Sequence, residues 1–162
     1  MYDIVDTDDP CDLMLAGTEV TGSCQRVGGD PNLNKCLMAY VADGKNRMIA
    51  LKDPVTGRII ARSVIRLLLD KITNRPVMFL ERVYPSLADT KQRGAIIAYA
   101  KKHVQKLDVP LLTQEAAKGT SYPGEVVSLG GQAPFEYEDA GDGVIRGSVY
   151  ALGELFRLDS RS

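Results

Sequence analysis

Glu81 is the acidic side chain whose surroundings best suit it to acid–base chemistry. It lies in the run of residues 77–84, which is rich in β-branched and aromatic side chains and predicts a strand. Strand alternation puts Glu81 on the same face as Phe79 and Val83, where a carboxylate is partly desolvated. A carboxylate placed in this way is a candidate general base.

A structural interpretation of Glu81 competes with the catalytic one. The segment expected to lie beside residues 77–84 carries Arg62 and Arg66, and either arginine would form an ion pair with a buried carboxylate. From the sequence alone, the base and the structural ion pair both remain open.

Cys24 and His103 offer a different chemistry. Cys24 lies in a short segment rich in Gly and Ser, and His103, the only histidine, follows far downstream, an order that nucleophilic thiol hydrolases use. His103 stands between Lys102 and Val104, at the flank of a predicted helix face. We therefore expect a solvent-facing histidine far from Cys24, and a cysteine-dependent hydrolase is an alternative only if the two side chains meet.

A third group of residues suits the binding of an anion. Arg93, Gly94 and Ala95 stand near the expected start of a helix, where main-chain N–H groups lack partners and the helix dipole favours negative charge. Gly94 would let a ligand approach the main chain closely, and Arg93 would add a charged contact. The alternative is that Arg93 is a solvated side chain of the first helical turns.

The composition indicates one ordinary globular domain. The 162 residues include 20 basic and 21 acidic side chains, a net charge of −1, so we expect neither nucleic acid nor a membrane as a partner. No apolar run reaches the roughly 18 residues that span a bilayer, and the first residues lack a signal-peptide pattern. Three cysteines without CxxC spacing indicate reduced thiols in a cytoplasmic protein, rather than disulfides or a metal site.

Turn signals and hydrophobic periods divide the chain into a lead-in, one domain and a tail. Residues 1–12 are acidic, show no hydrophobic period and predict a loose lead-in; residues 153–162 predict a tail. The domain between them, residues 13–152, begins with an expected meander that includes a hairpin turn at Asp43-Gly44. Its predicted strands cover residues 13–20, 36–41, 48–51, 58–69 and 77–84.

The second half of the chain predicts one crossover and a closing hairpin. Apolar residues recur at helical spacing over about 90–107, and the short run 109–113 then predicts a strand parallel to the last strand of the meander. Residues 133–138 and 144–152 flank a Gly-Asp-Gly turn and predict a hairpin. The predicted fold class is α/β (α+β), a mixed sheet with an antiparallel meander, one central crossover helix and a C-terminal hairpin.

This order of elements resembles the GNAT superfamily of acetyltransferases over about residues 13–152. In those enzymes a strand and a short loop lead to a Gln/Arg-x-x-Gly-x-Gly/Ala turn that opens a helix. Here Val83-Tyr84-Pro85 is followed by Lys91-Gln92-Arg93-Gly94-Ala95, in which only the last three residues stand for the full motif. The phosphate-binding motif is thus shortened.

The resemblance implies that acetyl-CoA or another acyl-CoA binds to Val83, Arg93, Gly94 and Ala95. The acyl group would be transferred to an amine acceptor that the sequence does not identify, with a protein among the candidate acceptors. Glu81 is then the implied base, because several such enzymes carry an acidic residue on the corresponding strand.

A tyrosine is the implied proton donor, and three tyrosines follow the predicted central helix. Tyr122 takes the expected place, between residues 109–113 and the final hairpin, while Tyr137 and Tyr150 remain alternatives. A second function also stays open: the shortened motif suits a non-catalytic GNAT-shaped binding module, as a domain of a larger regulatory or host-directed protein.

Overall fold

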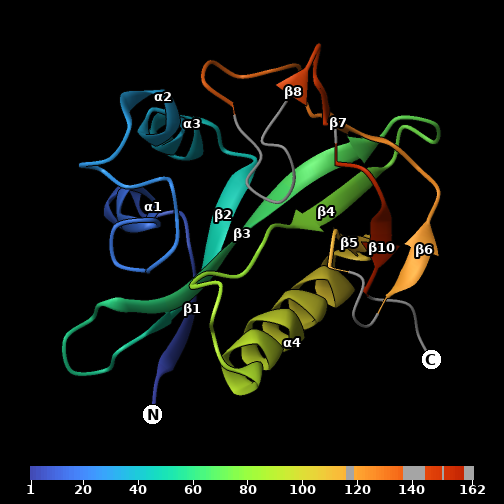
Figure 1. Ribbon diagram of the computed structural model, residues 1–162. Helices are drawn as coiled ribbons and strands as arrows, with labels where there is room; N and C mark the ends of the chain where they lie inside the picture. The colour runs from blue at the N-terminus through green and yellow to red at the C-terminus, as the bar shows by residue number, and fades with distance from the viewer. Residues whose placement is uncertain (116–118, 137–144, 151, 159–162) are drawn as a thin grey trace.

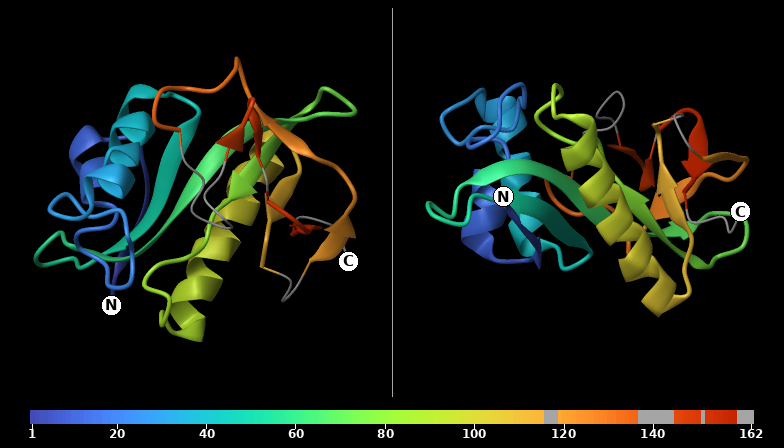
Figure 2. Two further views of the ribbon diagram at one scale, coloured as in Figure 1. Left: turned by 45° about the horizontal axis from the view of Figure 1, so that its top comes forward. Right: turned by 90° about the horizontal axis from the view of Figure 1, so that it is seen from below.

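In the part of the chain that the structure describes, one mixed sheet carries the short helices α1, α2 and α3 on one face and the long helix α4 on the other (Figures 1 and 2). The computed structural model describes all residues except 116–118, 137–144, 151 and 159–162. In the described part of the chain, ten strands join this sheet, and a single neighbouring pair is parallel. The predicted fold class is therefore confirmed.

An antiparallel meander forms the first half of the sheet, as predicted. Its strands are β1 (Asp3–Thr7), β2 (Asn46–Lys52), β3 (Ile59–Asp70) and β4 (Pro76–Leu80). The predictions at 48–51 and 58–69 match β2 and β3, and β4 covers the first part of the predicted 77–84 strand. β3 is the longest strand and contacts β2, β4 and β7 (Val126–Ser128), which makes it the centre of the sheet.

The first 20 residues of the chain correct two predictions. The acidic lead-in is not loose, because β1 pairs with β2 along its whole length. Residues 13–20 do not form a strand: α1 (Pro10–Leu15) includes the first three of them and the rest form turns and bends. Asp9 accepts hydrogen bonds from the N–H groups of Cys11 and Asp12 at the start of α1. Asp9-Pro10 is thus a helix start signal, in which Pro stands where its missing N–H costs nothing.

The predicted strand at 36–41 is also a helix. The chain passes through α2 (Pro31–Asn34) into α3 (Cys36–Ala42), so Asp43 ends a helix and the Asp43-Gly44 hairpin prediction is wrong. Leu37 and Tyr40 are buried whereas Met38 and Val41 are exposed, which is a helical pattern. The run is apolar throughout, so its sequence does not reveal which period it follows.

The central crossover agrees with its prediction. The helix α4 (Thr90–Leu107) has the predicted bounds, and β5 (Leu111–Thr113) lies parallel to β4 with Met78 opposite Leu111. Asp89 and Gln92 form a capping box at the start of α4, and Asp108 ends the helix with a left-handed backbone. Local signals thus define both ends of this element.

The C-terminal part adds the strands β6 (Thr120–Tyr122), β8 (Ile145–Arg146), β9 (Val149–Tyr150) and β10 (Leu155–Arg157). β8 and β9 form a tight hairpin at Gly147-Ser148, whereas residues 133–136 are not a strand and the Gly-Asp-Gly turn at 141–143 lies outside the described residues. β10 lies between β5 and β6, so the segment expected as a tail contributes to the sheet.

The two faces of the sheet carry separate hydrophobic cores. Ile49 and Leu51 of β2 pack with Ile96 and Ala100 of α4, and the intervening residues of β2 pack with α1 and α3 on the opposite face. The described residues include no helix that is both long enough and apolar enough to cross a membrane.

Gly17 tests how tightly the loop after α1 is packed. A Cβ atom on Gly17 would lie 1.9 Å from the carbonyl oxygen of Gln25, whereas one on Gly44 would meet no heavy atom within 4 Å. We expect Gly17→Ala to lower the free energy of unfolding by about 1–3 kcal/mol, because the main chain must move to relieve the overlap. Gly44→Ala is the matched control in urea unfolding, and equal stability of the two variants would contradict this packing.

Candidate functional site

The end of β4 carries an irregularity that creates the candidate site. Glu81 donates its N–H to the carbonyl of Val64, and Tyr84 pairs with Arg62, so two steps along β3 are matched by three along the neighbouring chain. One extra residue on one strand is a β-bulge. The bulge reverses the alternation, so that Glu81 and Val83 belong to opposite faces, and the prediction that they share a face is wrong.

The same region opens a cleft between the parallel strands. β4 pairs with β5 only at Met78 and Phe79; beyond them the chain stays with β3, while β5 continues beside β10. A cavity of about 220 Å³ lies in this opening, next to the first turns of α4. Its lining is mostly apolar and includes Leu80, Glu81, Val83, Thr90, Arg93, Gly94, Ile97, Lys101, Thr113, Glu115 and Leu158.

The start of α4 faces this cavity but already holds a negative charge. The carboxylate of Asp89 accepts a hydrogen bond of 2.7 Å from the N–H of Gln92. Thr90 and Gly94 line the cavity, whereas Ala95 packs against the core. Gly94 is the fifth residue of the helix, and a Cβ placed there would meet nothing within 4 Å, so the space beside it is open.

Arg93 connects the two sides of the cleft. Its Nη1 atom lies 3.1 Å from the Oε1 atom of Glu115, which follows β5, and its Nη2 atom donates a hydrogen bond of 2.7 Å to the carbonyl of Ser86. Both partners of the Arg93–Glu115 ion pair are partly exposed. Arg93 therefore lies at the cavity, where it is bound to a carboxylate of the protein.

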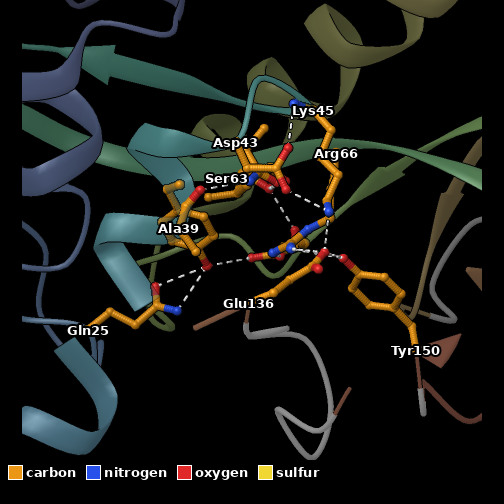
Figure 3. A network of polar contacts seen from close by, with 12 residues as sticks. Gln25, Ala39, Asp43, Lys45, Ser63, Arg66, Glu136 and Tyr150 are labelled. Carbon is orange, nitrogen blue, oxygen red and sulfur yellow. Dashed lines mark hydrogen bonds and ion pairs between the residues drawn. The ribbon is translucent and has the colours of Figure 1, made fainter. Parts of the chain in front are cut away.

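On the opposite face of β4, the carboxylate of Glu81 enters a buried polar network (Figure 3). Glu81 is 1% exposed; it pairs with Arg66 and accepts a hydrogen bond of 3.2 Å from the hydroxyl of Tyr40. Tyr40 also contacts Gln25, which in turn contacts Arg62. The structural interpretation of Glu81, an ion pair with Arg66, is thus confirmed.

Glu136 forms the second half of this network. Its carboxylate lies 2.6 Å from Lys45 Nζ and 3.6 Å from Arg66 Nη1, and it accepts a hydrogen bond from the Tyr150 hydroxyl. Lys45 also pairs with Asp43 at 2.6 Å. Arg66, labelled beside Glu136 and Tyr150 in Figure 3, contacts the carboxylates of both Glu81 and Glu136, so this guanidinium connects the two halves.

Cys24 and His103 belong to different layers. His103 lies on α4 and its Nδ1 atom is 3.2 Å from Asp6 of β1. Cys24 is exposed in the loop between α1 and α2, whose neighbouring residue Gln25 contacts Tyr40 on the other face of the sheet. The arrangement offers no support for a Cys–His pair. Among the described residues, no group of three His, Cys, Asp or Glu side chains could hold a metal ion.

Comparisons with known structures agree with this geometry. A GNAT family acetyltransferase from Brucella melitensis in complex with acetyl-CoA matches with a TM-score of 0.55 and 13% identity, over 83% of this chain and 92% of that one. The chain has the GNAT fold. A GNAT family acetyltransferase from Staphylococcus aureus matches with a TM-score of 0.51 and 13% identity, over 70% and 85% of the two chains.

A structure described as a probable acetyltransferase also matches, with a TM-score of 0.52 and 13% identity over 67% of this chain and 75% of that one. No protein-family model and no curated protein sequence matches this chain.

Tyr122 lies away from the other residues that the sequence predicted for the acyl-CoA site. Its hydroxyl donates a hydrogen bond to Asp70, at the end of β3 that neighbours the start of β4, whereas Glu81 follows the end of β4. Burial, together with this bond, raises the pKa of Tyr122 to about 12. The tyrosine that shares a partner with Glu81 is instead Tyr150, through Arg66. Tyr137 lies outside the described residues.

Several residues of the site were missed by the sequence interpretation. Thr113 and Glu115 line the cavity, and Lys45 and Glu136 complete the network on the other face. Glu115 follows the short predicted strand 109–113, and its position just after that strand could have placed it at the cleft. Lys45 and Glu136 are 91 positions apart, and no local pattern relates them.

The pKa of Glu136 makes the network testable. Burial by itself raises this pKa, but the hydrogen bonds from Lys45, Tyr150 and the N–H of Ala133 outweigh burial, and the pKa is lowered. A carboxyl group with a lowered folded-state pKa stabilises the protein above its unfolded pKa, and this stabilisation is lost as the pH falls through the folded value.

We therefore expect Glu136→Gln to lower the free energy of unfolding by about 3 kcal/mol at pH 7. The difference from wild type should shrink as the pH falls below the unfolded-state pKa of about 4.3, because the unfolded carboxyl group then binds a proton, and it should vanish once the pH has fallen through the lower folded-state pKa. Urea unfolding at pH 7, 5 and 3.5 measures the difference in unfolding free energy, and Glu154→Gln, at an exposed position, is the control. A difference that does not change with pH would contradict the charged role of Glu136.

Proposed function

We propose that the chain binds acetyl-CoA or a related acyl-CoA between β4 and β5 and transfers the acyl group to an amine. The observation that carries this proposal is the cavity of about 220 Å³ where the two parallel strands separate. The GNAT fold supports it, and one structural neighbour is described as a complex with acetyl-CoA. The identity of the amine is left open, because acceptor pockets in such folds depend on variable loops.

The residues that would hold the coenzyme lie on both sides of the cavity. In the bulge the main chains of Glu81 and Tyr84 bond to β3 and that of Val83 does not, so the main chain of Val83 is suited to the amide-rich arm of an acyl-CoA. Gly94 offers open space beside the helix, and of the two cations that line the cavity, Arg93 and Lys101, Arg93 lies nearer the helix start and would contact a phosphate. Acetyl-CoA supplies an acyl thioester, whose carbonyl carbon an amine attacks with release of the thiol.

Glu81 is the proposed base in this scheme, and its position restricts how it acts. Its carboxylate points to the face of α3, so an amine would have to approach the bulge from that side. Arg66 and Tyr40 hold the carboxylate there. Of the two candidate tyrosines that the structure describes, Tyr150 is the one that shares Arg66 with Glu81, and burial raises the pKa of Tyr150 and keeps its hydroxyl protonated.

A binding module that does not use the coenzyme is the second candidate. Asp89 places a negative charge at the helix start, where the phosphates would sit, and Arg93 is paired with Glu115. Both contacts oppose a pyrophosphate. Titration of the wild type with acetyl-CoA at millimolar concentration, followed by calorimetry and thermal unfolding, separates the two candidates. Heat of binding and a raised Tm support the transferase, and their absence supports the module.

Gly94→Val provides a direct test of the cavity. A side chain at this position fills space beside the helix and should weaken acetyl-CoA binding about tenfold or more, by blocking close approach to the main chain. The unfolding temperature should change little, because no atom lies within 4 Å of the new Cβ. Gln105→Val, at an exposed position of the same helix, is the control, and an equal loss of affinity in both variants would contradict the assignment.

Glu115→Gln should have the opposite effect. It releases Arg93 for the coenzyme phosphates, so the affinity for acetyl-CoA should rise about two- to fivefold, the worth of a partly exposed ion pair. Acetyl-pantetheine, which lacks the phosphates, should bind equally to both forms. Glu125→Gln removes the exposed ion pair with Lys71 and is the control. Unchanged affinity of Glu115→Gln for acetyl-CoA would exclude a phosphate role for Arg93.

A further inference from the structure

Glu136 is held by an unusually complete set of polar groups. Lys45 Nζ lies 2.6 Å from its Oε1 atom and Arg66 Nη1 lies 3.6 Å from the same atom. The Tyr150 hydroxyl donates a hydrogen bond to it, and Ser128 Oγ lies 3.1 and 3.2 Å from the two carboxylate oxygens. The N–H of Ala133 donates a further hydrogen bond of 2.8 Å to Oε2.

These groups belong to the framework of the sheet rather than to the segment that carries Glu136. Arg66 lies on β3, Ser128 on β7 and Tyr150 on β9, and Lys45 precedes β2. The side chains of Lys45 and Arg66 are 3% and 1% exposed. The sheet thus builds a desolvated pocket with two cations and two hydroxyl groups, which is the chemistry that binds a carboxylate.

Glu136 reaches this pocket from an irregular segment. Residues 133–136 form no strand, and Phe135 adopts a φ of 60°, a backbone conformation that bulky side chains rarely take. Beside this segment lies a cavity of about 450 Å³, lined by residues 129–135 and by the end of α3 up to Asp43, the second partner of Lys45. Open space therefore adjoins the segment that delivers the carboxylate.

We propose that Lys45, Arg66, Ser128 and Tyr150 form a carboxylate-binding site that Glu136 occupies as an internal ligand. A carboxylate on an external ligand would bind there when Glu136 leaves, so Glu136 keeps the site closed in the free protein. This site lies on the face opposite the cavity between β4 and β5, and it depends on its own polar contacts rather than on the coenzyme. It is joined to Glu81 through their shared partner Arg66.

Rescue of Glu136→Ala by acetate tests the proposal. The substitution removes the Cγ atom and the carboxylate, the same atoms that make up acetate. Acetate should raise the Tm of Glu136→Ala by about 3 °C or more for each tenfold increase above its dissociation constant. Acetamide, which is neutral and of the same shape, should have no such effect, nor should sodium chloride at equal ionic strength.

Wild type and Glu136→Gln are the controls, because in both proteins the side chain of residue 136 still fills the carboxylate-binding site. Acetate should change the Tm of both no more than sodium chloride does. If Glu136→Ala is unfolded in buffer, circular dichroism measures whether acetate or acetamide restores its folded structure. Folding in acetate but not in acetamide supports the proposal. Equal effects of acetate and acetamide, or no folding in either, would show that Glu136 is only a structural partner of Arg66. Because the test contains no coenzyme, its outcome is separate from that of the acyl-CoA proposal.

Discussion

The buried guanidinium of Arg66 is the constraint on which much of this structure depends. A cation that is almost completely removed from water must be compensated, and here Glu81 and Glu136 compensate it from two different parts of the chain. Burial alone would lower the pKa of Arg66, but Glu81 and two tyrosines raise it, so the charge is retained. The position of the C-terminal segment over the sheet is thereby coupled to the centre of β3.

The bulge after β4 separates two kinds of chemistry that a regular strand would place together. On the face of α4 it leaves an apolar cavity beside Val83, and on the face of α3 it directs the carboxylate of Glu81 toward Arg66. A single extra residue thus gives the chain a ligand-sized opening and a charged network within a few residues of each other. The cavity is where we propose that an acyl-CoA binds, and the charged network lies on the other face of the sheet.

The acidic N-cap of helix α4 stabilises the helix but disfavours the binding of phosphates at the helix start. Asp89 and Gln92 satisfy main-chain N–H groups at the start of the helix, which stabilises the helix without any ligand. The negative charge of an acidic cap also offsets the positive end of the helix dipole, which would otherwise attract phosphates. The pairing of Arg93 with Glu115 works in the same direction, so the site is electrostatically closed by the protein's own carboxylates. Coenzyme binding would therefore have to compete with internal partners.

The sequence by itself determined the elements whose signals are local: the capped helix Thr90–Leu107, the strands β2 and β3, and the crossover to β5. It could suggest Arg66 as a partner of Glu81, because neighbouring strands of a meander are expected to pair. It did not distinguish α3 from a strand, since an unbroken apolar run shows no period until burial divides its faces. Only the tertiary structure decided three features: the bulge at 81–84, the position of Tyr122, and the contacts among Lys45, Arg66 and Glu136. These contacts join positions far apart in the chain, so they leave no local pattern in the sequence.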